Sequence, residues 1–297
     1  MGGDFLSVLP IRENVRKSFS PIAGDRGQPP ARIGLREFIH VSINRQYLKV
    51  RQQYRHLQAC VGYLSRSAPD TRFILFGRGR SGTTALVSLL DALSAVRCEG
   101  EILHDYVPFP FVHVRGRSRR TRVQGYGCKI LSYQLRDVQS ALNAPRHFLR
   151  ALHHRHGFDL LYLRRTNLLR HALSNIRARR DQFHRHKSAP AEQSPGLEVD
   201  PEHVLDWMRR SEALQRYEAE VLEGLPYLSL TYEEHMRDPS AHQSTVNRIC
   251  DYLGVPSAPV QTEYQKLAPR SLRESVTNYE ALARRLESTE YARFLGE

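Results

Sequence analysis

A turn rich in glycine, arginine and threonine is the feature of this sequence with the clearest chemistry. It lies in the segment RFILFGRGRSGTTALVSLL, residues 72–90, between a stretch typical of a buried strand and the apolar face of a helix. Glycines let the backbone approach an anion, and the N–H groups of a helix's first turn point toward it. The segment therefore predicts a phosphate site, whose candidate ligands are Arg78, Gly79, Arg80, Ser81, Gly82, Thr83 and Thr84.

This loop departs from the loop of nucleotide triphosphatases. The run Gly77–Thr84 keeps both glycines of the pattern G-x-x-x-x-G-K-[ST], but Thr83 stands where the lysine belongs. The cation is Arg80 instead, whose planar guanidinium suits an oxyanion. Without the lysine, the loop is poorly equipped to hold β- and γ-phosphates with magnesium, yet it suits a single 5′-phosphate.

A second segment, Leu160–Ser174, again reads as a strand, arginine and a helix that carries serine. Together the two segments resemble those of sulfotransferases that use 3′-phosphoadenosine-5′-phosphosulfate (PAPS) as donor, and most closely the bacterial carbohydrate enzymes of the nodulation-factor and trehalose type. In that family an arginine and a serine grip the 3′-phosphate of the donor. The resemblance implies that Arg165 and Ser174 do so here, with Arg164 as the alternative to Arg165.

Further segments resemble the family in the expected order. Val96–Leu103 is similar to the segment with the family's catalytic glutamate, which implies Glu101 as the base. Tyr227–Pro239 resembles the element that places an aromatic residue, here Tyr232, against the adenine, and Ser271–Leu282 resembles the closing segment of the bacterial group. We expect Arg80 to act as a catalytic clamp on the 5′-phosphate.

Three other residues are candidates for the chemistry. Glu99 is the second choice of base and His104 the alternative to both glutamates. Lys129 lies in the otherwise apolar run YGCKIL, where a lysine must find a partner or an anion. We expect Lys129 either to approach the sulfuryl group or the acceptor, or to extend from the strand end to solvent.

The elements that must position these residues alternate between strand and helix. This alternation predicts an α/β fold with a P-loop-like parallel sheet flanked by helices, as in sulfotransferases. We expect a catalytic domain over residues 71–297, preceded over residues 1–70 by an arm and a basic helical extension. The predicted core elements are Thr71–Phe76, Ser81–Leu93, Tyr126–Leu131, Arg136–His154, Asp159–Leu163, Asn167–Arg179, Pro201–Glu223 and Thr245–Leu253, with a loop at His186–Asp200.

Within the extension, apolar residues recur at helical spacing from Phe38 to Val61 and predict one or two basic amphipathic helices. We expect their apolar face to pack against the catalytic domain; the alternative is an oligomer or membrane contact. Two arginine-rich runs, His113–Arg122 and Arg177–Lys187, do not have the aromatic interleaving of a single-strand nucleic-acid platform. They are interpreted as solvated or substrate-facing surfaces, and the first is expected to border the acceptor cleft.

Composition limits the partners and the compartment. The 297 residues carry a formal net charge of +13, which suits a donor with three anionic groups but also nucleic acid or anionic membrane. The four cysteines stand singly, without zinc-ligand spacing, as expected for reduced thiols in the cytoplasm. No stretch is long and apolar enough to predict a membrane span.

The predicted function is transfer of a sulfuryl group from PAPS to an acceptor hydroxyl, on a carbohydrate or glycolipid, without a metal. Two alternatives belong to other classes. A nucleotide kinase with a degenerate loop would need magnesium and a triphosphate, and a non-catalytic basic binding module would explain the charge but not the two phosphate segments. No specific nucleic acid is expected as partner, and the sequence indicates neither the oligomeric state nor the particular acceptor molecule.

Overall fold

The computed structural model describes residues 53–64, 68–139, 142, 144–181, 196–261 and 271–296. The chain divides into two units, Met1–Arg51 and Gln52–Glu297, and all described residues belong to the second. The predicted N-terminal arm and most of the predicted loop His186–Asp200 lie outside them. The division into an extension and a catalytic domain at residue 70 stays a prediction.

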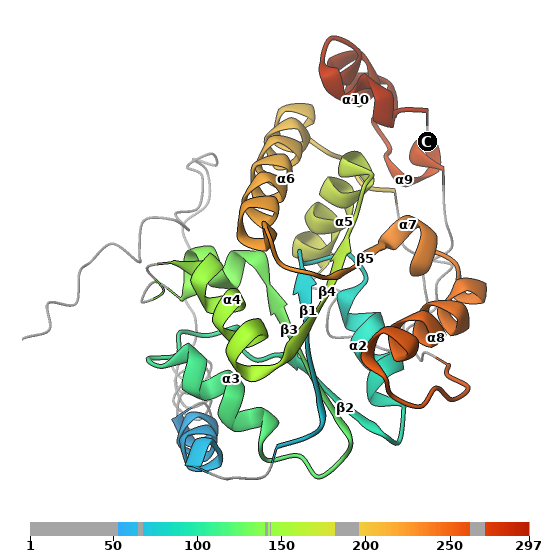
Figure 1. Ribbon diagram of the computed structural model, residues 1–297. Helices are drawn as coiled ribbons and strands as arrows, with labels where there is room; N and C mark the ends of the chain where they lie inside the picture. Colours follow the sequence, from blue (N-terminus) through green and yellow to red (C-terminus); the bar gives the residue numbers. More distant parts are fainter. Residues whose placement is uncertain are drawn as a thin grey trace, which may run out of the picture. The chain divides into compact units, whose positions relative to one another are not determined.

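A five-stranded, fully parallel sheet forms the centre of this unit (Figure 1), and its strand order is β2-β3-β1-β4-β5. The α/β fold with a parallel sheet flanked by helices is thereby confirmed. Because the strands are parallel, their carboxyl ends share one edge of the sheet, where such folds bind ligands. The strands are β1 (Thr71–Gly77), β2 (Val96–Glu101), β3 (Gly125–Leu131), β4 (Phe158–Arg164) and β5 (Leu228–Thr231).

Helices cover both faces of the sheet, because side chains of the central strand alternate between two apolar clusters. Ile74 and Phe76 face the cluster under α3 and α4, whereas Phe73 and Leu75 face α2 and α8. A third cluster joins α5, α6 and the C-terminal elements. The helical elements are α2 (Thr83–Asp91), α3 (Pro110–Ser118), η2 (Gln134–Val138), α4 (Pro145–His156), α5 (Leu168–Asp181), α6 (Pro201–Leu222), α7 (Tyr232–His235), η5 (Pro239–Ala241), α8 (His242–Leu253), α9 (Leu272–Ser275), α10 (Tyr279–Glu287) and η6 (Glu290–Phe294).

The predicted helix Arg136–His154 is wrong as a single element. A π-helical turn, η2, ends at Val138, and α4 begins only at Pro145, which occupies the first turn of that helix. Proline is favoured there because it has no N–H to satisfy and its φ is preset for a helix. The residue before proline avoids the helical conformation, so the two pieces could not join.

Residues 53–64 form a helix that packs against α3, but not through its apolar face. The contact consists of small and polar groups: Gly62 and Gly116 approach each other closely, and the His56 and His113 rings are 5.5 Å apart. Ala59 is fully buried there. The helix thus contacts α3, in line with the predicted packing, but several of its large apolar side chains are exposed, so its packing face is not the expected one. The two glycines explain the difference, since they let the backbones meet where a side chain would hold them apart.

Candidate active site

The loop between β1 and α2 is held in a shape that depends on glycine. A Cβ on Gly77 would overlap the carbonyl oxygen of Leu163 in β4, and Gly82 has φ +84° with the ring of Tyr232 beside it. Arg80 also adopts a positive φ, 64°, which is uncommon for a residue with a side chain. Such conformations persist where the surroundings impose them, and they often mark binding sites.

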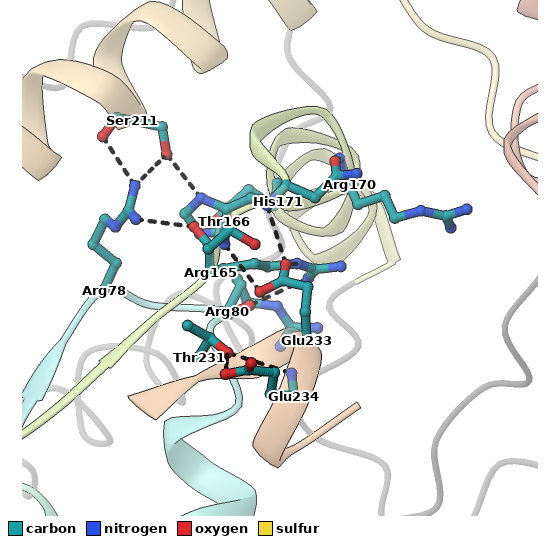
Figure 2. A network of polar contacts seen from close by, with 12 residues as sticks. Arg78, Arg80, Arg165, Thr166, Arg170, His171, Ser211, Thr231, Glu233 and Glu234 are labelled. Carbon is teal, nitrogen blue, oxygen red and sulfur yellow. Dashed lines mark hydrogen bonds and ion pairs between the residues drawn. The ribbon is translucent and has the colours of Figure 1, made fainter. Parts of the chain in front are cut away.

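Arg78 fixes this loop to α6 and does not extend toward a ligand. Its guanidinium is 1% exposed and donates to the carbonyl oxygens of Ser211 at 3.0 Å and Arg165 at 3.2 Å (Figure 2). It also forms an ion pair of 3.3 Å with the buried carboxylate of Glu218. The sequence predicted Arg78 as a phosphate ligand, but in this conformation its side chain is occupied beneath the loop. Only its backbone remains for a ligand.

His171, which the sequence analysis missed, holds the loop from α5. Its Nε2 lies 2.8 Å from the carbonyl oxygen of Gly79, and its Nδ1 lies 2.7 Å from Oγ of Ser211. Burial, together with the charge of Arg78, lowers the pKa of His171 to about 3. The ring is therefore neutral, with Nε2–H donating to Gly79 and the Ser211 hydroxyl donating to Nδ1. No sequence signal pointed to it, because the contact joins segments about ninety residues apart.

The two predicted phosphate segments meet at the carboxyl edge of the sheet. Nε of Arg80 donates to Oγ of Ser174 at 3.3 Å, and Nη1 of Arg165 donates to the carbonyl oxygen of Arg80 at 3.4 Å. The guanidinium of Arg165 lies over the ring of Tyr232, 4.5 Å from its centroid. Four residues predicted to bind the donor thus lie together, and Figure 2 labels two of them, Arg80 and Arg165.

Glu233 orders the turn that carries Arg165. Its carboxylate accepts from the backbone N–H groups of Thr166 at 3.0 Å and Asn167 at 3.1 Å, just before α5. It also lies 3.9 Å from Nε of Arg165. Burial opposes ionisation, but these backbone bonds outweigh it and lower the pKa of Glu233. A charged Glu233 therefore keeps Arg165 directed toward the loop.

A second group of candidates lies at the other end of the loop, where β2 and β3 finish. The ammonium of Lys129, which is 4% exposed, donates to Oγ1 of Thr84 at 3.0 Å and pairs with Oε1 of Glu101 at 3.0 Å. A register shift in β2 between Glu99 and Glu101 brings Glu101 opposite Lys129. Lys129 is thus partnered inside the protein and points to the first turn of α2.

Glu101 is a strongly anionic group in this arrangement. Its Oε2 accepts from Gln134 at 2.8 Å and Tyr133 at 3.3 Å, and it lies 3.4 Å from Nδ1 of His104. Burial alone would raise the pKa of Glu101, but the hydrogen bond from His104 and the charge of Lys129 lower it to about 2. The same hydrogen bond raises the pKa of His104, whose side chain is largely exposed.

Glu99, the second choice of base, is occupied elsewhere. Its carboxylate accepts two bonds from Arg117, at 2.6 and 2.7 Å, and one from the Tyr126 hydroxyl at 2.7 Å. Burial opposes ionisation, yet the bonds from Arg117 prevail and lower the pKa of Glu99. This set of bonds leaves Glu99 with a structural role between β2 and α3.

The first arginine-rich run faces the helix of residues 53–64 rather than an open cleft. Arg119 donates to the carbonyl oxygen of Tyr63 at 3.0 Å, Arg120 donates to Gln58 at 2.6 Å, and Arg115 lies over the Tyr63 ring. With Arg117 held by Glu99, four of the five arginines of this run have partners inside the protein. This differs from the expectation that the run borders the acceptor cleft.

Metal ligands, cysteines and membrane-spanning helices can be considered for the described residues only. Within these ranges no group of three or more His, Cys, Asp and Glu side chains is arranged to hold a metal ion. The cysteines, all described, are free thiols, of which Cys98, Cys128 and Cys250 are buried. Of the helices in the described part of the chain, none has the length and hydropathy needed to cross a membrane.

In comparisons with known proteins, the matches to this chain are all solved structures. No protein-family model and no curated protein matches the chain. It is similar to the crystal structure of a sulfotransferase from Alicyclobacillus acidocaldarius, with 18% identity, a TM-score of 0.41, and coverage of 75% of this chain and 95% of the other. It is also similar to mouse sulfotransferase SULT7A1 complexed with PAP, with 15% identity, a TM-score of 0.34, and coverage of 80% and 78%. At such values, the functional argument rests on the chain's own residues.

Proposed function

We propose that this protein is a sulfotransferase that moves the sulfuryl group of PAPS to an acceptor hydroxyl. The observation that carries the proposal is the meeting of two anion-binding segments, where Arg80 contacts both Ser174 and Arg165. A nucleotide with phosphates on both its 5′ and 3′ oxygens needs two such groups side by side. An ordinary mononucleotide needs only one.

Different residues of the candidate site would bind the different parts of the donor. The N–H groups of the loop and the first turn of α2, with Arg80 and the hydroxyls of Ser81, Thr83 and Thr84, would hold the 5′-phosphosulfate. Arg165 and Ser174 would hold the 3′-phosphate, and Tyr232 would lie against the adenine. Arg165 is the better choice than Arg164 because its guanidinium lies beside the loop, within reach of both Arg80 and Tyr232.

In the proposed reaction, the acceptor oxygen attacks sulfur as the bond between sulfur and the 5′-phosphate oxygen breaks. The electron pair of that bond stays on the phosphate, and the acceptor proton passes to a base. Lys129 and Arg80 would stabilise the charge that develops on the leaving phosphate, one from each side of the loop. This use of fixed cations is why we propose transfer without a metal.

His104 and Glu101 would act together in removing the proton of the acceptor hydroxyl. A carboxylate with a pKa of about 2 accepts a proton poorly near neutral pH. His104, with a raised pKa and an exposed ring, is better suited to take the acceptor proton, while Glu101 orients and stabilises its charged form. We therefore propose His104 as the proton acceptor and Glu101 as its positioning residue, which reverses the order favoured by the sequence.

The geometry at Thr84 favours this function over a nucleotide kinase. In a nucleotide triphosphatase loop, the hydroxyl at this position binds the magnesium ion. Here Oγ1 of Thr84 accepts from the ammonium of Lys129, so a cation of the protein already lies at that point. A carbohydrate or glycolipid remains our proposed acceptor, on the strength of the motif resemblance.

The test is calorimetric binding of 3′,5′-adenosine bisphosphate, the spent donor, with and without magnesium. We expect metal-independent binding that Arg165→Ala weakens by roughly tenfold to a hundredfold, because a charge-assisted contact is lost. Arg164→Ala is the matched control and should retain most of the affinity. Absence of binding, or binding only of a triphosphate with magnesium, would contradict the proposal in favour of a kinase.

A further inference from the structure

The helix of residues 53–64 carries its apolar residues on the outside. Tyr54, Leu57, Val61 and Leu64 are 60%, 61%, 65% and 80% exposed. Their three- and four-residue spacing places them in one stripe along the helix, here called the exposed stripe. A contiguous apolar stripe on a helix that is already anchored by its opposite face marks an interaction surface.

The anchoring is firm enough to keep the stripe in this orientation. Gly62 and Gly116 bring the helix backbone against α3, Arg119 donates to the carbonyl oxygen of Tyr63, and Arg120 donates to Gln58. The inward face is made of small and polar residues that satisfy these contacts. Turning the stripe inward would break them, so the exposed position is the one this packing selects.

The charge of the sequence before, within and after this helix indicates the kind of partner. Between Glu37 and Asp70 the sequence contains no acidic residue, while it contains Arg45, Lys49, Arg51, Arg55 and Arg66. A second copy of the chain would bring like charges together. An anionic lipid surface instead pairs with the basic residues while it buries the apolar ones, and the net charge of +13 adds to the attraction.

The stripe is also linked to the candidate active site. Phe109, itself 63% exposed, stacks on His56 with ring centroids 6.3 Å apart. Phe109 follows Glu101 and His104 in the same connecting segment, so this stacking joins the helix to the segment that carries the residues assigned to the base. We propose that this chain binds the surface of an anionic membrane through the exposed stripe, without crossing the bilayer. If the proposed function holds, on which this extension rests, the acceptor is a lipid-linked hydroxyl.

The experiment is co-sedimentation of the full chain with vesicles of phosphatidylcholine alone or of equal parts phosphatidylcholine and phosphatidylglycerol. We expect binding to the anionic vesicles to be at least about tenfold stronger, and to weaken as salt is added. Replacing Leu57 and Val61 together with Ser should lower it about tenfold or more. The matched control is Tyr252→Ser, an exposed aromatic residue on α8, which covers the opposite face of the sheet.

A second variant, Arg55→Glu, tests the charge without touching the stripe, and melting curves show that each variant is folded. Equal binding to both kinds of vesicle, or binding that the stripe substitutions leave unchanged, would overturn the proposal. The proposal would also be overturned if the chain did not bind vesicles and instead formed a dimer that the same substitutions dissociate. Failure here is distinct from failure of the proposed function, because Arg165→Ala should leave vesicle binding intact and the stripe variant should still bind 3′,5′-adenosine bisphosphate.

Discussion

Glu99 and Glu101 lie two positions apart in β2, yet their carboxylates have different partners. Arg117 and Tyr126 enclose Glu99, whereas Glu101 meets Lys129 and His104 at the end of the strand. The register shift between the two glutamates is the cause, since it changes which residue of β3 each one faces. At the scale of single residues, this shift separates a structural carboxylate from a candidate functional one.

The pair of His104 and Glu101 predicts a pH dependence. His104 must be neutral to accept a proton, and its pKa is raised above 6.5, so the rate should increase as pH rises through that higher pKa. Glu101→Gln removes the charge that raises the pKa. The increase should therefore shift to lower pH, and the plateau rate should fall by roughly tenfold to a hundredfold because the ring is less well oriented.

The measurement is the pH profile of initial rates, with His104→Gln alongside. That second variant should lose roughly 10²–10⁴-fold in kcat. A profile that Glu101→Gln does not shift would remove Glu101 as a positioning residue. If Glu101→Gln abolishes activity while His104→Gln is mild, the sequence-based order of the two bases is the correct one.

The buried ring of His171 predicts acid sensitivity of the fold. Its pKa is about 3 in the folded protein and near 6.5 when unfolded, so the unfolded chain binds the extra proton between these values. The contribution of the neutral ring to the free energy of unfolding is present above pH 6.5 and is lost as pH falls toward 3, on the order of 5 kcal/mol in total.

Urea unfolding at several pH values checks this prediction. His171→Gln should be less stable than the wild type near neutral pH, because Gly79 and Ser211 lose part of their bonding. It should also lose less stability on acidification. Parallel stability curves for the two proteins would show that His171 does not titrate as inferred; His113, whose pKa is lowered to about 4, contributes to both curves alike.

At the scale of elements, the contact between α3 and the helix of residues 53–64 depends on the absence of side chains. A Cβ on Gly116 would overlap the carbonyl oxygen of Ala59. Gly116→Ala should therefore force the two helices apart at a cost of about 1–3 kcal/mol, even though alanine is the better helix former. The exposed stripe would lose its fixed orientation in consequence.

Hydrogen exchange of residues 53–64, together with a melting curve, measures this effect. Gly100→Ala is the control, because a Cβ there meets nothing within 4 Å, and it should change stability by no more than about 0.5 kcal/mol. Unchanged exchange in Gly116→Ala would mean that the helix is held by its polar contacts alone.

At the scale of the whole molecule, the sequence predicted the parallel sheet and the strand, loop and helix from β1 to α2 well. Phosphate binding by that loop stays a proposal. Apolar strands, glycines and helix starts are local signals, so β1, the loop and α2 could be recognised without tertiary information. The proximity of Arg80 to Ser174 and Arg165 agrees with the resemblance, which orders these segments as in sulfotransferases. Their roles in binding the donor stay proposals.

The features that the sequence did not predict are contacts between segments that lie far apart in the sequence. Nothing local shows that Arg78 turns away to Glu218, or that His171 reaches the carbonyl of Gly79. The outward stripe was missed for the same reason. An apolar helical face is ordinarily the packing face, and the close pairing of Gly62 with Gly116, together with the polar contacts beside it, reverses it here.

The third apolar cluster has a consequence for the order in which this protein acquires its structure. The sheet is complete once Thr231 has been synthesised, whereas the cluster behind α5 also needs residues from Leu272 to Phe294. Ser174 lies on α5. The apolar cluster that packs against this helix can therefore be completed only after the last of these residues has left the ribosome. A nascent chain would therefore form the glycine-rich loop between β1 and α2 before α5, which carries Ser174, is fully packed.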